Sequence, residues 1–534
     1  ITVNDSPAHK ALALETARES IVLLKNEDDL LPLDKELGAL AVIGPNANDL
    51  QVLQGNYSGT PSRAISILEG IRQKIDAATD VYYAPGCGLA EGMPILDPIP
   101  PHRLRPINSD AGQVGMRGAY YDNPNFEGEP VKEQIDAAVD FVWKGHTPIT
   151  GEVGDLFSVR WTGTLIPPET GTYKLGVRGC TGFRLYVDDE EVLGLDLWYN
   201  PTTRTAEVEL EAGRLYYLRL DYQSARTEHD PHVQLLWSPP SADPLAEAIA
   251  VASKADAVVA VMGLSSTLEG EEMPVEVPGF KGGDRIDIGL PAPQKELLKR
   301  IHALGKPMIL VLLSGSALAV NWAAEHVPAI IEVWYPGQAS GPALADVLFG
   351  DYNPAGRLPV TFYKSVEDLP HFENYDMADR TYRYFQGEPL YAFGHGLSYT
   401  TFDLTNLRLT DTVVDVGDEV AITLDVTNTG MRAGDEVVQL YVHTPDTPQP
   451  TPIKTLKGFQ RVSLTPGETK TITFHLHTHQ LGFYNDDGNY IINPGSVEVY
   501  VGDASDHLPL SGQFEIGGES TVAEKVFFSR AEVS

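Results

Sequence analysis

Cysteine is nearly absent from this chain of 534 residues, which contains only Cys87 and Cys180. Two cysteines cannot supply the several bridges of a disulfide-stabilised scaffold. They also fall in segments that the sequence pattern assigns to different domains, so no bridge between them is expected. Packed cores must therefore hold the fold together, and a content of 42% hydrophobic residues is sufficient to build them.

Basic residues are also few. The chain has 39 basic and 74 acidic residues, which gives a formal charge of −35. Nucleic acids and anionic membranes attract clustered Lys and Arg, so neither is expected as a partner. No uninterrupted apolar run reaches about 18 residues, and the amino end, ITVNDSPAHK, lacks the features of a signal peptide. This composition suits a soluble protein with neutral ligands. Secretion, the periplasm and the cytoplasm all stay open as its location.

The sequence also lacks His, Cys and Asp groups at the spacing of metal ligands, so no metal or other cofactor is expected. His302 and His395 are expected to pack or to form hydrogen bonds. At this length the chain should form about three or four domains.

Two separated segments, 1–107 and 241–402, alternate between helical and strand patterns. Strands are expected at 38–45, 80–86, 255–264, 307–315 and 329–337, with helices at 66–75, 243–255, 293–305, 317–326 and 340–350. This βαβ alternation predicts one open α/β sheet with helices on both faces. The sheet is interrupted by residues 108–240, which alternate apolar and polar positions and contain many turns. Residues 403–534 show the same β pattern and are expected to form an immunoglobulin-like sandwich.

An acidic loop follows one of the expected strands. The stretch STLEGEEMPVEVPGFKGGDR, residues 266–285, contains Glu269, Glu271, Glu272 and Glu276, and it comes directly after the apolar run at 255–264. Open α/β sheets bind ligands at the carboxyl ends of their strands. Clustered carboxylates disfavour one another's ionisation, which is one way to keep a carboxyl group protonated for catalysis. Asp284 and Arg285 are expected to pair and set the return of the loop.

Several motifs in both α/β segments resemble glycoside hydrolase family 3, which contains β-glucosidases and β-xylosidases. They are ALETARESIVLLKNEDDLLPL near the start, GNYSG at 55–59, NPAGRLPVTF at 353–362, RTYRYF at 380–385 and PLYAFGHGLSYTTF at 389–402. Residues 108–240 resemble the PA14 module that some members carry at this place. Residues 403–515 resemble their fibronectin type III-like domain, and a carboxyl-terminal tail completes the segment 403–534.

The resemblance implies an exo-acting retaining β-glycosidase that takes oligosaccharides or aryl β-glycosides and places its acid/base glutamate on this loop. The spacing GLSSTLEGE is similar to a xylosidase-like pattern whose second glutamate corresponds to Glu271. Glu271 is therefore the expected proton donor, followed by Glu269 and then Glu272. The family's nucleophile lies on an amino-terminal (β/α)8 barrel whose motifs do not occur here, so a barrel domain or chain is the expected partner and this chain alone should be inactive.

Three alternatives stay open at this point. A glucosidase and a xylosidase differ in their substrate by one hydroxymethyl group, and a β-glucosidase is the first expectation, with a β-xylosidase as the alternative. A non-catalytic, sugar-associated scaffold would have the same domains. A homo-oligomer also stays open.

Where calcium-dependent PA14 modules have an Asp-Asp pair, this chain has Arg178-Gly179-Cys180, and Asp188-Asp189 falls in a later hairpin turn. Calcium-dependent sugar binding is therefore not expected.

Overall fold

The computed structural model of the chain describes residues 4–59, 61–107, 112–143, 148–149, 156–196, 202–225, 230–273, 275–445, 447 and 451–534. The chain forms two compact units, one of Ile1–Gly92 with Leu245–Ser534 and the other of Met93–Pro244. Residue 108, the predicted start of the insertion, lies outside the described residues, so the boundaries at 108 and 240 stay predictions. Within the described ranges, no helix is both long and apolar enough to cross a membrane.

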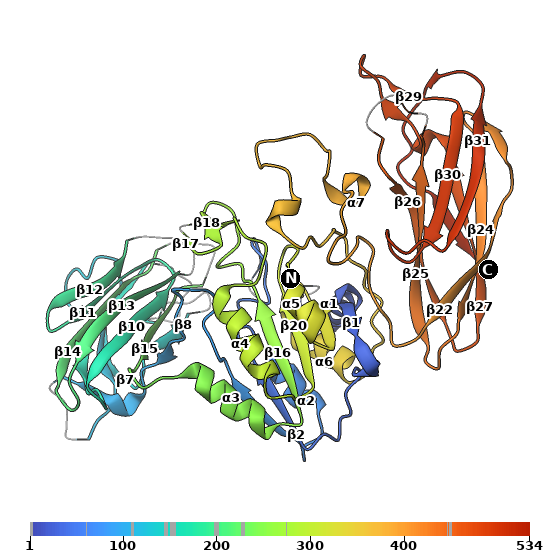
Figure 1. The fold of residues 1–534 in the computed structure, drawn as a ribbon. Helices are drawn as coiled ribbons and strands as arrows, with labels where there is room; N and C mark the ends of the chain where they lie inside the picture. The colour runs from blue at the N-terminus through green and yellow to red at the C-terminus, as the bar shows by residue number, and fades with distance from the viewer. Residues whose placement is uncertain are drawn as a thin grey trace. The chain divides into compact units, whose positions relative to one another are not determined.

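The first unit contains a mixed six-stranded sheet in the order β1-β21-β20-β16-β2-β3 (Figure 1). Five strands run parallel, and β1 pairs antiparallel with β21 at one edge. The central strands are short apolar runs that are buried on both faces, as a helix-covered sheet requires. The strands are β1 (Val22–Asn26), β2 (Ala39–Ile43), β3 (Asp80–Ala84), β16 (Ala257–Gly263), β20 (Met308–Leu313) and β21 (Ala329–Glu332).

Helices cover both faces of this sheet, which confirms the predicted open α/β architecture. Helix α2 (Ile67–Lys74) connects β2 to β3, whereas α4 (Ala292–His302) and α5 (Asn321–His326) connect strands in the opposite direction along the sheet. Right-handed crossovers place such connections on opposite faces. The direction of winding therefore reverses between β2 and β16, which is where open α/β sheets bind ligands. The remaining helices are α1 (Pro7–Ser20), α3 (Pro244–Lys254), α6 (Ser340–Leu348) and α7 (Thr381–Tyr384).

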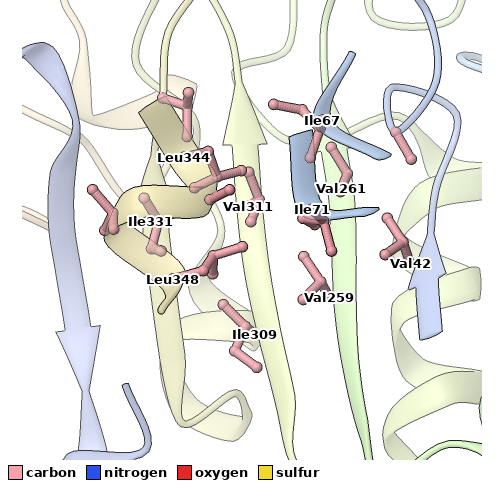
Figure 2. Packing of buried hydrophobic residues seen from close by; sticks show 14 of the residues in the cluster. Val42, Ile67, Ile71, Val259, Val261, Ile309, Val311, Ile331, Leu344 and Leu348 are labelled. Carbon is pink, nitrogen blue, oxygen red and sulfur yellow. The ribbon is translucent and has the colours of Figure 1, made fainter. Parts of the chain in front are cut away.

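The core on the α2 face joins the sheet to α2 and α6 (Figure 2). Its side chains include Val259 and Val261 of β16, both completely buried. Helices α2 and α6 pack closely because Gly70 and Gly341 meet at their crossing. A Cβ atom on Gly70 would lie 2.1 Å from the carbonyl carbon of Gly341, so only glycine fits there.

Helix α5 is shorter than predicted. The sequence pattern favours a helix over 317–326, whereas α5 begins at Asn321. Ala319 instead forms a parallel bridge with Gly289, and its N–H donates to the carbonyl oxygen of Ile288. This tertiary pairing holds the residues before α5 in an extended conformation.

The second unit is built from two antiparallel sheets around one aromatic-rich core. One sheet has the order β13-β10-β15-β4 with β8 alongside β15, and the other has the order β12-β11-β14-β9-β6-β7 with β5 alongside β9. Asp188 and Asp189 form the turn between β11 and β12, as the sequence predicts, and both adopt the left-handed backbone conformation. Cys180 of this unit and Cys87 of the first unit are both free thiols. The strands are β4 (Asp97–Pro98), β5 (Leu104–Pro106), β6 (Met116–Tyr121), β7 (Lys132–Asp136), β8 (Asp140–Val142), β9 (Ser158–Leu165), β10 (Gly171–Gly179), β11 (Gly182–Val187), β12 (Glu190–Leu195), β13 (Thr202–Leu210), β14 (Tyr216–Gln223) and β15 (His232–Ser238).

The carboxyl-terminal part is a β-sandwich, as predicted. One sheet has the order β22-β24-β27-β33 and the other β23-β31-β30-β25-β26, and their inward side chains form one core. A third, small sheet contains β28, β29 and β32. The strands are β22 (Phe402–Leu409), β23 (Val413–Asp415), β24 (Glu419–Asn428), β25 (Gly434–His443), β26 (Thr455–Leu464), β27 (Thr469–His477), β28 (Phe483–Tyr484), β29 (Tyr490–Ile492), β30 (Gly495–Gly502), β31 (Leu510–Gly517), β32 (Thr521–Val522) and β33 (Arg530–Val533).

Candidate active site

The acidic loop leaves the carboxyl end of β16, beside the point where the sheet reverses its winding. The loops that follow β2, β20 and β21 begin at the same edge, because parallel strands end on one side of the sheet. Buried Gln294 of α4 fixes the end of β16, since its amide group both accepts from the N–H of Gly263 and donates to the carbonyl oxygen of Gly263, each at 2.7 Å. Asn46, after β2, donates at 3.0 Å to the carbonyl oxygen of Leu264.

The loop returns as a small three-stranded sheet of β17 (Glu276–Val277), β18 (Phe280–Lys281) and β19 (Asp284–Arg285). Its two ends meet where the N–H of Gly270 donates to the carbonyl oxygen of Gly283 at 3.1 Å. Pro274 lies outside the described residues. The loop is therefore ordered by its own backbone pairing on either side of the glutamate cluster.

Glu269 is held by three hydrogen bonds at this edge. Its Oε1 accepts from the N–H of Gly315 and from the hydroxyl of Tyr335, each at 2.7 Å. Its Oε2 accepts from the hydroxyl of Ser316, also at 2.7 Å. Gly315 and Ser316 follow β20, and Tyr335 follows β21. Glu269 therefore connects the segments that follow three neighbouring strands, β16, β20 and β21.

Arg285 supports the same arrangement and corrects one prediction. Its Nη1 donates to the Ser316 hydroxyl at 2.8 Å and to the carbonyl oxygen of Ala317 at 2.6 Å. Because Ser316 accepts from Arg285, its own proton is available to Glu269. Burial lowers the pKa of the Arg285 guanidinium, and the charge of Glu269 opposes that shift. The predicted pair of Asp284 with Arg285 is wrong, because successive side chains of β19 point to opposite sides.

Glu332, at the end of β21, is a buried carboxyl group that the sequence analysis missed. It is completely buried, and its Oε1 accepts from the N–H of Trp334 at 3.0 Å and from the Ser314 hydroxyl at 3.3 Å. Burial raises its pKa well above the ordinary value, and these two hydrogen bonds offset only part of that effect.

Glu271 differs sharply from Glu269 in its surroundings. Its side chain is exposed, and its Oε2 accepts a hydrogen bond from the hydroxyl of Tyr57, which belongs to the GNYSG segment after β2. This contact joins the loops on the two sides of the reversal point. The hydrogen bond to the Glu271 carboxylate and its negative charge raise the pKa of the Tyr57 hydroxyl, and burial adds little to this shift.

The other glutamates of the cluster are less constrained. Glu272 and Glu276 are both exposed, and Glu272 adopts a left-handed backbone conformation with φ +48°. The structure therefore brings Glu269 and Glu271 to the candidate site in different roles, with Glu272 next to them at the tip of the loop.

The residues that sequence reasoning missed are Tyr57, Arg285 as a partner of Ser316, Gly315, Glu332 and Tyr335. Gly315 and Tyr335 closely follow strands of the sheet and Glu332 ends one, so the rule that parallel strand ends converge could have selected these three. The same rule does not select Tyr57 or Arg285. His302 and His395 pack or form hydrogen bonds, as predicted. His302 packs edge-on against Trp322, and Nε2 of His395 lies 3.0 Å from the carbonyl oxygen of Leu24.

Comparison with known families identifies both recognisable parts of the chain. Residues 21–399 match the Glycosyl hydrolase family 3 C-terminal domain, and residues 436–505 match a Fibronectin type III-like domain. Both resemblances inferred from the sequence motifs are confirmed. The PA14 resemblance of the inserted segment stays a prediction.

Individual relatives divide between two activities. A xylan 1,4-beta-xylosidase of Xylanibacter ruminicola is 36% identical over 510 residues, which cover 92% of this chain and 56% of the xylosidase. A beta-glucosidase of Rhizobium radiobacter is 32% identical over 554 residues, with 96% and 64% covered. The crystal structure of the Kluyveromyces marxianus beta-glucosidase in complex with glucose superposes with a TM-score of 0.72 at 28% identity, covering 98% of this chain and 64% of that one. The chain thus spans between 56% and 64% of the length of these relatives.

Proposed function

Because the chain belongs to glycoside hydrolase family 3, we propose that it supplies the proton donor of an exo-acting retaining β-glycosidase, and that Glu271 is this donor. The contrast between two carboxylates of one loop carries the assignment. Glu269 accepts from three protein donors and has a structural task, whereas Glu271 is exposed and has one described partner, the Tyr57 hydroxyl. Of these two carboxyl groups, that of Glu271 is free to meet a substrate.

The reaction needs two carboxyl groups about 5–5.5 Å apart. One attacks the anomeric carbon, and the other protonates the departing glycosidic oxygen. In the second step the former acid, now ionised, takes a proton from the water that hydrolyses the glycosyl-enzyme. We assign the first role to an aspartate of the (β/α)8 barrel that members of the family carry, as a domain or chain that partners this one, and the second role to Glu271.

The neighbours of Glu271 would serve this role by positioning. Tyr57 holds one oxygen of Glu271, which leaves the other oxygen for the substrate. Glu269 fixes the base of the loop through strand ends that belong to the rigid sheet. A site held in this way needs little rearrangement when a sugar binds.

The first test is turnover by the 534-residue chain itself. Without a partner barrel, the chain should not hydrolyse aryl β-glycosides. Hydrolysis at a rate normal for glycosidases, on the order of 1 to 1000 per second, would contradict the assignment of the nucleophile to a barrel. Adding a matching barrel should restore activity.

The second test is the substitution Glu271→Gln in the enzyme completed by its barrel. General acid help is worth about a hundred- to ten-thousand-fold, so hydrolysis of alkyl glycosides should fall by that factor. Release of a dinitrophenolate, which needs little protonation, should fall much less. Azide needs no base, so it should restore turnover of the activated substrate and yield a β-glycosyl azide.

Two neighbouring variants serve as matched controls. Glu272→Gln should retain activity, and Glu269→Gln should slow activated and unactivated substrates by similar factors without azide rescue. Rescue at Glu269 or Glu272 instead of Glu271 would move the acid/base role to that residue. Absence of rescue and of leaving-group dependence at all three would show that the acidic loop does not supply the proton donor.

The sugar is proposed as β-D-glucose at a non-reducing end, with β-D-xylose as the second candidate. The spacing of the loop GLSSTLEGE and the Xylanibacter ruminicola relative favour xylose, whereas the Rhizobium radiobacter and Kluyveromyces marxianus relatives favour glucose. The ratio of kcat/KM for nitrophenyl β-D-glucoside and β-D-xyloside decides between them. A preference of tenfold or more for the xyloside would reverse the proposed order.

We also propose that the inserted β-unit is a PA14-type module that works without calcium. Its two antiparallel sheets suit that module, and Gly179 and Cys180 offer no carboxylate at the place of the calcium-binding pair. Addition of a chelator should not change its thermal unfolding. A rise in its melting temperature with millimolar calcium would contradict this assignment.

A further inference from the structure

A cavity lies at the β-sandwich, within the compact unit that also contains the candidate active site but formed by other elements. The cavity has a volume of about 290 Å³ and is lined by α7, β26, β28, β29 and the segment after β32. Two hydrogen bonds connect helix α7 to the sandwich. The N–H of Leu456 donates to the Tyr382 hydroxyl at 3.1 Å, and the N–H of Ile453 donates to the carbonyl oxygen of Arg383 at 2.7 Å. A volume of this size is at the small end of ligand pockets and corresponds to a compact ligand.

Three cationic side chains line the cavity, namely Arg383, Lys457 and Lys525. Among the described residues of its lining there is no Asp or Glu, although acidic residues outnumber basic ones by 74 to 39 in the whole chain. Arg383 and Lys457 are partly buried, and partly buried cations without a carboxylate partner among the described residues are unusual in a protein. Their convergence in so acidic a chain indicates a site for an anion.

The hydrogen bonds of these cations leave much of their donor capacity unused. The Nε of Arg383 is buried and has no partner among the described residues. The ammonium group of Lys457 donates to one acceptor, the carbonyl oxygen of Gln480, at 2.5 Å. Burial lowers the pKa of Lys457 to about 8, and the charges of Arg383 and Lys525 add to this effect. A bound anion would relieve this repulsion and accept the unused donors.

Aromatic rings provide the other half of the site. The ammonium group of Lys525 lies over the rings of Tyr484 and Tyr490, at 5.8 and 5.7 Å from their centres. Tyr484 is 60% exposed, and Phe527, whose ring centre lies 5.4 Å from the same ammonium group, is 78% exposed. Clustered exposed rings mark interaction surfaces, and flat rings suit the apolar faces of pyranose sugars. A simple inorganic anion has no apolar face that could pack on these rings.

We propose that this pocket, which we call the cationic pocket, binds a sugar that bears a carboxylate. The carboxylate is recognised by Arg383, Lys457 and Lys525, and the sugar ring packs on Tyr484, the exposed tyrosine of the lining. The site would bind acidic side groups or acidic units of a polysaccharide, at a place that makes no use of Glu271. The proposal therefore stands or falls independently of the proton donor.

The test is calorimetric titration of the 534-residue chain at pH 7 with three probes: methyl β-D-glucuronide, methyl β-D-glucoside and inorganic sulfate. The glucuronide should bind at least tenfold more tightly than either of the others, because only it has both a carboxylate and a ring. Equal binding of the glucuronide and the neutral glucoside would overturn the role of the cations. Equal binding of sulfate, or no binding of the glucuronide, would overturn the assignment to an acidic sugar.

Variants place the binding in the cationic pocket. Lys525→Gln is an exposed change that should preserve the fold, and it should weaken glucuronide binding at least fivefold. Arg383→Gln should weaken it at least tenfold. Lys470→Gln, on β27 of the same sandwich, makes the same change in charge outside the pocket and should leave the affinity unchanged. An equal loss with all three variants would show a general charge effect and contradict the proposal.

Discussion

The hydroxyl of Tyr335 donates a 2.7 Å hydrogen bond to Oε1 of Glu269 and thereby connects the residues after β21 with the loop after β16. Burial raises the pKa of Tyr335, and the charge of Glu269 adds to the shift, so the phenol stays a donor throughout the neutral range. This bond is one of the three through which residues after β20 and β21 hold the acidic loop.

Replacement of Glu269 should loosen this loop even in the isolated chain. Glu269→Ala removes the acceptor of the Gly315 N–H and of two hydroxyl groups, and a typical hydrogen bond contributes about 0.5–1.5 kcal/mol. Amide hydrogen exchange over residues 265–285 should accelerate by roughly ten- to a hundredfold, measured by mass spectrometry. Glu276→Ala, at an exposed position of the same loop, is the control and should change exchange little. Unchanged exchange in the Glu269 variant would refute the structural role.

The crossing of α2 and α6 predicts a strong effect of a single methyl group. Gly70→Ala would place Cβ 2.1 Å from the carbonyl carbon of Gly341, so the helices must move apart and the core shown in Figure 2 must shift. Overpacking of this kind is worth about 1–3 kcal/mol, and more where backbone atoms collide. Chemical denaturation should show a loss of at least about 2 kcal/mol. Gly59→Ala is the control, because nothing lies within 4 Å of that position.

Much of the architecture could be predicted because its signals are local. The run at 255–264 contains enough Val and Ala to predict a buried strand, and β16 occupies Ala257–Gly263. The antiparallel direction of β1 could not be predicted, because the pattern of Val22–Asn26 is the same for both directions and only the pairing with β21 distinguishes them.

The candidate site was predictable in place but not in detail. The rule for open sheets located the loop, yet the three donors to Glu269 lie 46 to 66 positions away in sequence. Their convergence depends on the strand order β21-β20-β16, which no local pattern encodes. For the same reason the sequence suggested that Arg285 pairs with its neighbour Asp284, whereas the fold supplies Ser316.

The α/β part and the β-sandwich are joined by a buried ion pair whose loss should be costly. Nη2 of Arg357 lies 2.8 Å from Oε1 of Glu436, and the two side chains are only 8% and 6% exposed. Glu436→Gln leaves a buried guanidinium without its counter-charge, so it should lower the free energy of unfolding by about 3–5 kcal/mol.

Two further variants test that explanation. Replacing both residues by Met should be less harmful than Glu436→Gln alone, since no charge then stays buried. Glu388→Gln, in the exposed pair with Lys364, should change stability by about 1 kcal/mol or less. Equal effects of the buried and exposed substitutions would contradict the assigned role of burial.

Glu332 predicts a particular dependence of stability on pH. Burial raises its pKa above the ordinary value of 4.5, so the folded state keeps a proton that the unfolded state releases. The contribution of this group is fully present below about pH 4.5 and is lost as pH rises toward the folded pKa, by up to about 1.4 kcal/mol per pH unit. Glu332→Gln has no such proton. Its stability relative to the unsubstituted chain should therefore increase between pH 4.5 and 7, measured by denaturant titration. A difference that is independent of pH would contradict the raised pKa.

The cationic pocket should lose affinity for methyl β-D-glucuronide as pH rises through about 8. Lys457 carries its charge mainly below that value. The charged and titratable groups that line the cavity with it are Arg383, Tyr384, Tyr484, Tyr490 and Lys525. A carboxylate beside Lys457 raises the pKa of its ammonium group, so binding near pH 8 should take up protons from the buffer. Calorimetry in two buffers of different ionisation enthalpy measures this uptake, which should approach zero at pH 6, where Lys457 is already charged. In Lys457→Met the uptake should vanish, and the weaker affinity that remains should no longer depend on pH between 7 and 9. Proton uptake that persists in that variant would assign the titration to another group and remove Lys457 from the site.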